Sequence, residues 1–109
     1  MADHLPPGAF RTGISATYNL NTIPRELRRP SVFPPETWGL VVVEFGSITL
    51  FVGSLPGQNV EPGVEGFIPP QTPFHVEDKG LPVLFHIEYF HEPRLADPQA
   101  LAAQLGGRG

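Results

Sequence analysis

Two histidines and a glutamate in the second half of the chain have the chemistry of a metal site or an acid–base pair: His75, His86 and Glu88. Alternate residues of a β-strand point to the same face, so His86 and Glu88 share a face if residues 83–90 form a strand. A hairpin that closes around Gly80 would place His75 opposite His86 on that face. A slip of one residue in this register would turn His75 to the other face.

Two imidazoles and one carboxylate suit a divalent ion such as iron, zinc, nickel or manganese. Glu88 lies in an apolar strand, where a carboxylate is costly unless a metal, a cation or a hydrogen bond compensates its charge. A structural ion pair of Glu88 with Arg28 or Arg29 is the alternative. No phosphate-binding glycine loop or serine nucleophile motif is visible, and we expect no organic cofactor.

The composition indicates one globular domain over residues 1–109, with residues 1–9 and 106–109 expected to be flexible. The 12 glycines and 14 prolines among 109 residues favour many turns between short strands. Strands are expected over residues 10–14, 16–20, 38–45, 47–53, 59–61 and 83–90, with a further short strand at His75. Residues 38–45 and 47–53 have the pattern of a hairpin. A helical turn is expected over 23–29 and a short C-terminal helix over 98–105.

This pattern predicts an all-β fold, an antiparallel sandwich or barrel. The strands expected over 38–45 and 83–90 are apolar on both faces. The interior of a barrel would cover only one face of each strand. A second subunit is the economical cover for the other face, and we therefore expect a homodimer. We expect the pocket wall to include Trp38, Phe74, Leu84 and Phe90.

The net charge, the cysteine content and the N-terminal sequence argue against several classes of partner and site. The net charge is −4 without a large basic cluster, which argues against nucleic acid. The chain has no cysteine, and therefore neither a disulfide nor a thiolate metal site. The N-terminal residues do not resemble a signal peptide, and no apolar run approaches the roughly 20 residues of a membrane helix. We expect a cytoplasmic protein without membrane contact.

The order of several short motifs over residues 23–91 resembles the TehB/YeaR-like family of small cupin-like proteins. The matching residues are Leu27-Arg28-Arg29, Pro35-Glu36-Thr37-Trp38-Gly39, Gly46, Ile68-Pro69-Pro70 and Ile87-Glu88-Tyr89. The resemblance implies a double-stranded β-helix with a ligand site inside the barrel. It also implies an association with tellurite and oxyanion stress. Ser31 stands where the family has its first histidine, and His86 could supply the missing nitrogen.

Three hypotheses for the function follow. The first is a metalloprotein in which His75, His86 and Glu88 hold a divalent ion that activates a small molecule inside the barrel. The second is a non-enzymatic module that binds a small molecule or an oxyanion. The third is a metal-free isomerase or cyclase in which Glu88 and His75 act as an acid–base pair on an organic substrate. The fold alone does not choose among them.

Overall fold

A computed structural model describes residues 5–6 and 8–92 of the chain. The strands are β1 (Phe10–Ile14), β2 (Tyr18–Asn19), β3 (Thr37–Phe45), β4 (Ile48–Val52), β5 (Gln58–Val60), β6 (Gly66–Ile68), β7 (Phe74–Glu77) and β8 (Leu84–His91). A single 3₁₀ turn, η1 (Arg25–Arg28), follows β2. No helix within this described part is long and apolar enough to cross a membrane. The expected helix over 98–105 falls outside the described residues.

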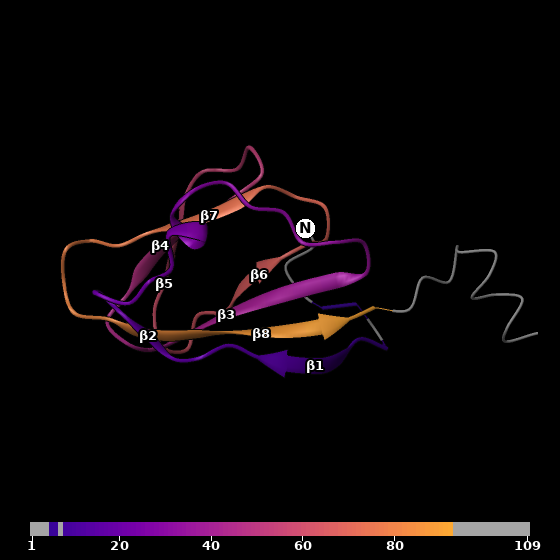
Figure 1. Ribbon diagram of the computed structural model, residues 1–109, viewed down its shortest axis with the longest axis horizontal. Coiled ribbons are helices and arrows are strands. Elements are labelled where there is room, and N and C mark those ends of the chain that lie inside the picture. Colours follow the sequence, from indigo (N-terminus) through magenta and orange to yellow (C-terminus); the bar gives the residue numbers. More distant parts are fainter. Residues whose placement is uncertain (1–4, 7, 93–109) are drawn as a thin grey trace, which may run out of the picture.

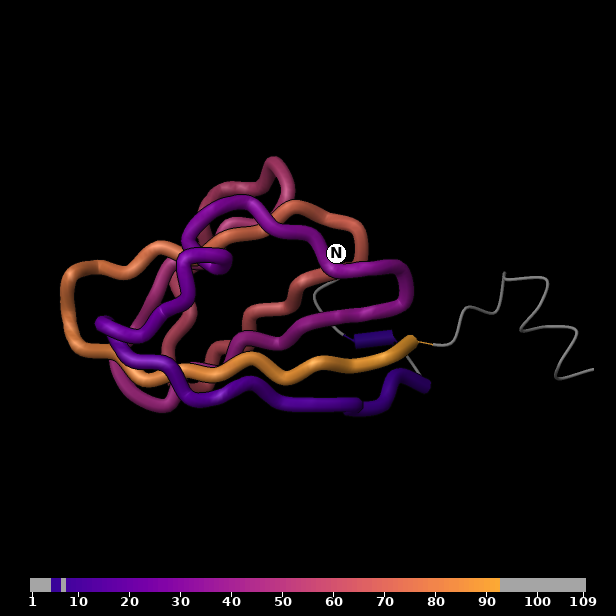
Figure 2. The backbone as a smooth tube through the Cα atoms, viewed as in Figure 1, coloured from indigo at the N-terminus to yellow at the C-terminus, as the bar shows by residue number. Residues whose placement is uncertain are grey.

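The strands form two antiparallel sheets (Figure 1). The larger sheet has the order β1-β8-β3-β6, and β2 also pairs with β8. The smaller sheet has the order β5-β4-β7. β8 is the central strand of the larger sheet, where it lies between β1 from the start of the chain and β3 (Figure 2). The expected fold class, an all-β arrangement of antiparallel strands, is confirmed by these two sheets.

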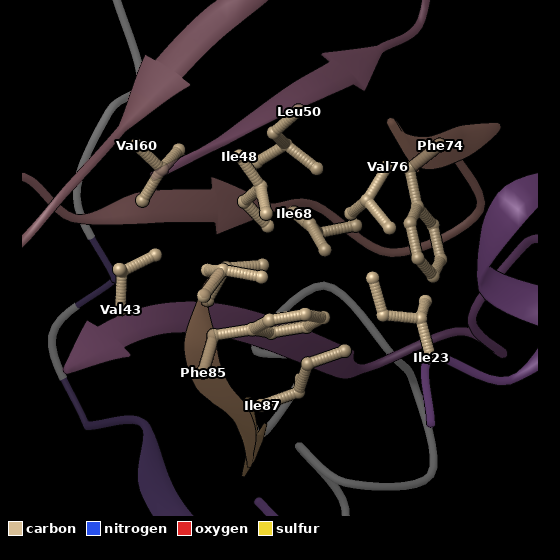
Figure 3. Packing of buried hydrophobic residues seen from close by; sticks show 12 residues of the cluster. Ile23, Val43, Ile48, Leu50, Val60, Ile68, Phe74, Val76, Phe85 and Ile87 are labelled. Carbon is tan, nitrogen blue, oxygen red and sulfur yellow. The ribbon is translucent and has the colours of Figure 1, made fainter. Parts of the chain in front are cut away.

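The core lies between the two sheets and is built by the alternation of side chains along each strand. Val43 of β3 and Phe85 of β8 point into it from the larger sheet, and Leu50 and Val76 point into it from the smaller one (Figure 3). Among the described residues no polar or charged side chain is buried. The interior of this fold is therefore a packed apolar layer.

Neither of the two hairpins expected from the sequence, that of residues 38–53 and that around Gly80, is formed. β3 pairs with β8 and β6, whereas β4 pairs with β5 and β7, so the chain changes sheets at Gly46. Gly46 makes this crossing with a φ of +77°, and a Cβ atom there would meet the carbonyl oxygen of Pro82 at 2.4 Å. β7 and β8 also belong to different sheets. The strands of each expected hairpin thus lie in opposite sheets instead of pairing with each other.

A β-bulge interrupts β3 at Glu44, where the pairing with β8 shifts between Val43 and Phe45. A bulge adds one residue to a strand and re-aims the side chains that follow. Phe45, which would share the inner face of Val43 in a regular strand, is instead paired with Leu84 and exposed. The bulge therefore moves one aromatic ring from the core to the surface.

Candidate functional site

His75 lies on the outer face of the smaller sheet. Its neighbours Phe74 and Val76 are buried in the core, so His75 points away from it. The imidazole stacks on Phe51, and its Nε2 atom is 3.4 Å from a carboxylate oxygen of Glu77. The expected pairing of His75 with His86 is therefore wrong, because β7 pairs with β4 and not with β8.

His86 and Glu88 do share a face, but it is the outer face of the larger sheet. Phe85 and Ile87, which alternate with them, are buried in the core. His86 Nδ1 lies 2.8 Å from Oε2 of Glu44, and His86 Nε2 lies 3.0 Å from Oε2 of Glu88. The other oxygen of Glu88 is 3.7 Å from Nη1 of Arg11. We call these four residues, Glu44, His86, Glu88 and Arg11, the charged row.

The charged row favours a protonated imidazole. Burial alone would lower the pKa of His86, but the hydrogen bonds to Glu88 and Glu44 outweigh it and raise the pKa above its usual value of 6.5. The side chains of His86 and Glu88 are only 12% and 19% exposed. When both ring nitrogens carry protons, each donates to one carboxylate. His86 is thus fixed in orientation, and its two carboxylates lie on opposite sides of the ring.

This geometry does not bring three ligands to one point. A metal bound at either nitrogen of His86 would displace one hydrogen bond and would face only one of the two carboxylates. The described residues contain no group of three or more histidine, aspartate or glutamate side chains that could hold a metal ion. The acid–base pair expected between Glu88 and His75 is not formed either, because the imidazole beside Glu88 is that of His86.

Ser31, in the place of the family's first histidine, makes structural hydrogen bonds. Its hydroxyl donates to the carbonyl of Glu26 at 2.6 Å. Its backbone forms an isolated antiparallel bridge with Phe74. Ser31 therefore ties the loop after η1 to the first residue of β7.

The four residues expected to line one pocket do not lie together. Trp38 and Phe90 face each other on the outer side of the larger sheet, and the indole nitrogen of Trp38 donates to Glu92 at 2.7 Å. Phe74 is part of the core. Leu84 borders a hollow at the end of the sandwich, near the β-bulge.

This hollow, the end pocket, has a volume of about 330 Å³. It lies where the turn after β2 meets the segment that leads into β8. Its wall is mostly apolar and consists of Asn19, Leu20, Asn21, Phe45, Pro82, Val83 and Leu84. The exposed ring of Phe45 and the exposed side chain of Leu84 border it. Two asparagines give the wall polar groups.

Arg28 links the turn after β2 to the loop between β7 and β8, beside the end pocket. Its guanidinium is 2.5 Å from a carboxylate oxygen of Asp78 and donates to the carbonyl of Leu20 at 3.2 Å. The other carboxylate oxygen of Asp78 accepts from the backbone of Gly80 at 2.7 Å. The hydrogen bonds from Arg28 and Gly80 lower the pKa of Asp78 below its usual 3.8. Arg28 is therefore the partner of Asp78, and the cation beside Glu88 is Arg11.

Sequence reasoning missed the end pocket because its wall comes from three separate segments. The turn after β2 is closed locally, since Asn21 donates its backbone N–H to the side chain of Asn19 at 2.8 Å. An Asn-x-Asn sequence is a turn signal, and it was the only available sign of this part of the wall. Phe45 reaches the pocket through the bulge, which the sequence did not indicate.

The fold has close counterparts among solved structures. A protein from E. coli strain K12 is 17% identical with a TM-score of 0.74; the match covers 84% of this chain and 98% of that one. TehB from Haemophilus influenzae is 12% identical with a TM-score of 0.75, over 92% of this chain but only 39% of TehB. TT1209 from Thermus thermophilus is 20% identical with a TM-score of 0.57, over 76% and 75% of the two chains.

These likenesses show the fold alone. No protein-family model matches the chain, and no curated protein matches it. The same architecture occurs as nearly the whole of the E. coli protein and as a part of TehB. The chain therefore shares the fold of these proteins, which here is built from two antiparallel sheets.

Proposed function

We propose that this protein is a non-enzymatic module that binds a small, mostly apolar organic molecule in the end pocket. The observation that carries the proposal is the end pocket itself, an apolar hollow of about 330 Å³ with two asparagines in its wall. Small-molecule sites are concave and mostly apolar, with a few polar groups that orient the ligand, and their volumes begin at about 300 Å³. The fold shared with TehB supports a module of the TehB/YeaR-like kind.

The position of the ligand differs from the barrel interior that the sequence suggested. The core between the sheets is filled by apolar side chains, and the described residues place no charged group there. The end pocket is open to solvent beside Phe45 and Leu84, two large apolar side chains that a ligand would shield from water. Burial of this apolar surface would favour binding.

The end pocket favours a neutral ligand over an oxyanion. Its lining residues carry no charge. The guanidinium of Arg28 is already occupied by Asp78 and by the carbonyl of Leu20. An anion would lose hydration there without gaining a cation, whereas a neutral carbonyl or hydroxyl could use the side chains of Asn19 and Asn21.

The metal and acid–base hypotheses receive less support from the geometry. His75 lies on the other sheet from His86 and Glu88. The hydrogen bonds of His86 to Glu44 and Glu88 occupy both ring nitrogens. A ligand or reaction at this imidazole would first have to break one of these hydrogen bonds.

Binding can be tested by a titration of the ¹⁵N-labelled protein with cyclohexanone and with benzyl alcohol. We expect saturable shifts of the backbone amides of residues 19–21 and 83–84. Leu84→Arg should abolish these shifts because the longer charged side chain occupies the pocket mouth. Leu55→Arg is the matched control, since Leu55 is also an exposed leucine but is not a lining residue. Scattered, unsaturable shifts, or shifts that persist in Leu84→Arg, would refute the proposal.

A further inference from the structure

The charged row alternates in sign along its length. Glu44 lies at one end, beside the bulge near the start of β8, and His86 follows. Glu88 comes next along β8, and Arg11 of β1 lies opposite Phe90 at the other end. The order of charges is therefore negative, positive, negative, positive when His86 is protonated. All four groups lie on the outer face of the larger sheet.

If a second copy presents the charged row in the opposite direction, each charge of one row faces an opposite charge of the other. In a face-to-face dimer, a twofold axis that crosses the row between His86 and Glu88 reverses its direction in the second copy. Arg11 of each copy then faces Glu44 of the other, and His86 of each copy faces Glu88 of the other. Every charge meets an opposite charge, and each contact occurs twice.

We propose that this outer face binds a second copy of the chain in this antiparallel arrangement. The two ends of the row are the open ones, since Arg11 is 56% and Glu44 46% exposed, whereas His86 and Glu88 are already largely covered. The 3.7 Å contact between Arg11 and Glu88 leaves guanidinium donors of Arg11 for a carboxylate of a second copy. The centre of the row thus needs little further desolvation, and its ends gain partners.

Apolar side chains flank the charged row on the same face. Val42 of β3 lies directly opposite His86 and is half-buried, whereas Leu40, opposite Glu88, is already buried. Ile14 of β1 is opposite Glu88 on the other side and is 55% exposed. Because the axis crosses the row, each flank meets the same flank of the second copy. Charge would set the orientation of the dimer, and these apolar contacts would add affinity. The proposal is independent of the end pocket.

Two charge reversals test the arrangement. Glu44→Lys places a lysine against Arg11 of the other copy, and Arg11→Glu places a second carboxylate against Glu44 of the other copy. Each change reverses two symmetry-related contacts, so we expect each variant to self-associate at least about tenfold more weakly than the parent protein. Analytical ultracentrifugation over micromolar concentrations measures this change, and circular dichroism checks that both variants are folded.

Mixing the two variants gives the decisive result. In a heterodimer of Glu44→Lys with Arg11→Glu, both contacts join opposite charges again, and the 1:1 mixture should form a heterodimer that native mass spectrometry identifies. The double variant Arg11→Glu/Glu44→Lys should also recover self-association. A change in internal structure alone would not be repaired by mixing two different chains.

The control variant is Glu77→Lys, which reverses an exposed carboxylate on the outer face of the smaller sheet and should leave the dimer unchanged. Three outcomes would overturn the proposal. One is a parent protein that is monomeric at about 100 μM, a concentration at which even weak specific dimers are populated. The second is a dimer that is insensitive to both charge reversals. The third is a failure of the folded variants to associate with each other when mixed.

Discussion

His75 lies flat against Phe51, with the ring centroids 4.6 Å apart and the ring planes inclined by 6°. The two residues are directly opposite each other on β7 and β4. Gly57 makes room for this pair, since a Cβ atom there would meet the Phe51 ring at 2.8 Å. His75 thus completes an aromatic pair on the surface of the smaller sheet and belongs to a different face from His86.

The first prediction concerns metal binding. We expect that calorimetric titration with Zn(II) shows no tight site that His75→Ala, His86→Ala and Glu88→Gln all abolish, because His75 and the other two residues lie on different sheets. Weak binding lost only in His75→Ala would reflect a single surface imidazole. A 1:1 site lost in all three variants would show that the ligand set inferred from the sequence is right and that the sheets rearrange around the ion.

The second prediction concerns the pH dependence set by His86. Its pKa is raised in the folded protein by Glu88 and Glu44 against the opposing effect of burial. A raised pKa means that the folded state holds the proton more tightly than the unfolded chain. The stabilisation is therefore complete below about pH 6.5 and is lost as the pH rises through the folded-state pKa.

Urea unfolding between about pH 5.5 and 8.5 measures this loss, which we expect to be roughly 1 kcal/mol or less at a partly solvated site. His86→Gln should flatten the profile over this range, whereas His75→Gln should leave it in place. If the His86→Gln profile falls as steeply as that of the parent protein, His86 is not the titrating group.

The third prediction compares two glycines that both have a positive φ. Gly80→Ala should cost about 1 kcal/mol of unfolding free energy, because its φ is +73° but no atom lies within 4 Å of the added Cβ. Gly46→Ala should cost at least about 3 kcal/mol, because its Cβ would also collide with the backbone at Pro82. Chemical denaturation gives both values. Equal costs would mean that the crossing at Gly46 relaxes without strain.

The fourth prediction concerns the ion pair between Arg28 and Asp78, beside the end pocket. Asp78→Asn removes the ion pair with Arg28 and should lower stability at pH 7 by about 0.5–1 kcal/mol, after allowance for solvent screening. The pKa of Asp78 is lowered by Arg28, so its stabilising effect is present above pH 3.8 and is lost as the pH falls through the folded-state value. The melting temperatures of the two proteins should therefore converge in acid. A difference that persists at about pH 2 would point to lost packing instead.

The positions of most strands could be predicted from the sequence, although no strand was expected at β6 (Gly66–Ile68). The strand expected over 10–14 is found as β1, and the strand expected over 38–45 is found as β3 with one more residue. Alternation also placed His86 and Glu88 on one face, and their side chains lie 3.0 Å apart. Local sequence contains this information because side-chain period and β-branched content act within a strand.

The pairing of the strands could not be predicted in the same way. A glycine turn between two apolar strands has the same local pattern whether the chain folds back within a sheet or crosses to the other one. At Gly46 the chain passes from β3 to β4, and around Gly80 it passes from β7 to β8; in both cases the second strand lies in the other sheet. The choice depends on contacts with distant residues, such as that of Gly46 with Pro82. For this reason His75 was expected opposite His86, and the end pocket was not expected.

The central position of β8 in the larger sheet has a consequence for folding during synthesis on the ribosome. β8 is the last strand of the described chain, yet β1, β2 and β3 all pair with it. Until Leu84–His91 has left the exit tunnel, the strand that joins these three strands into one sheet is missing. Before β8 emerges, the nascent chain must carry the apolar segments of these strands without the complete larger sheet, a stage at which chaperones protect unpaired strands.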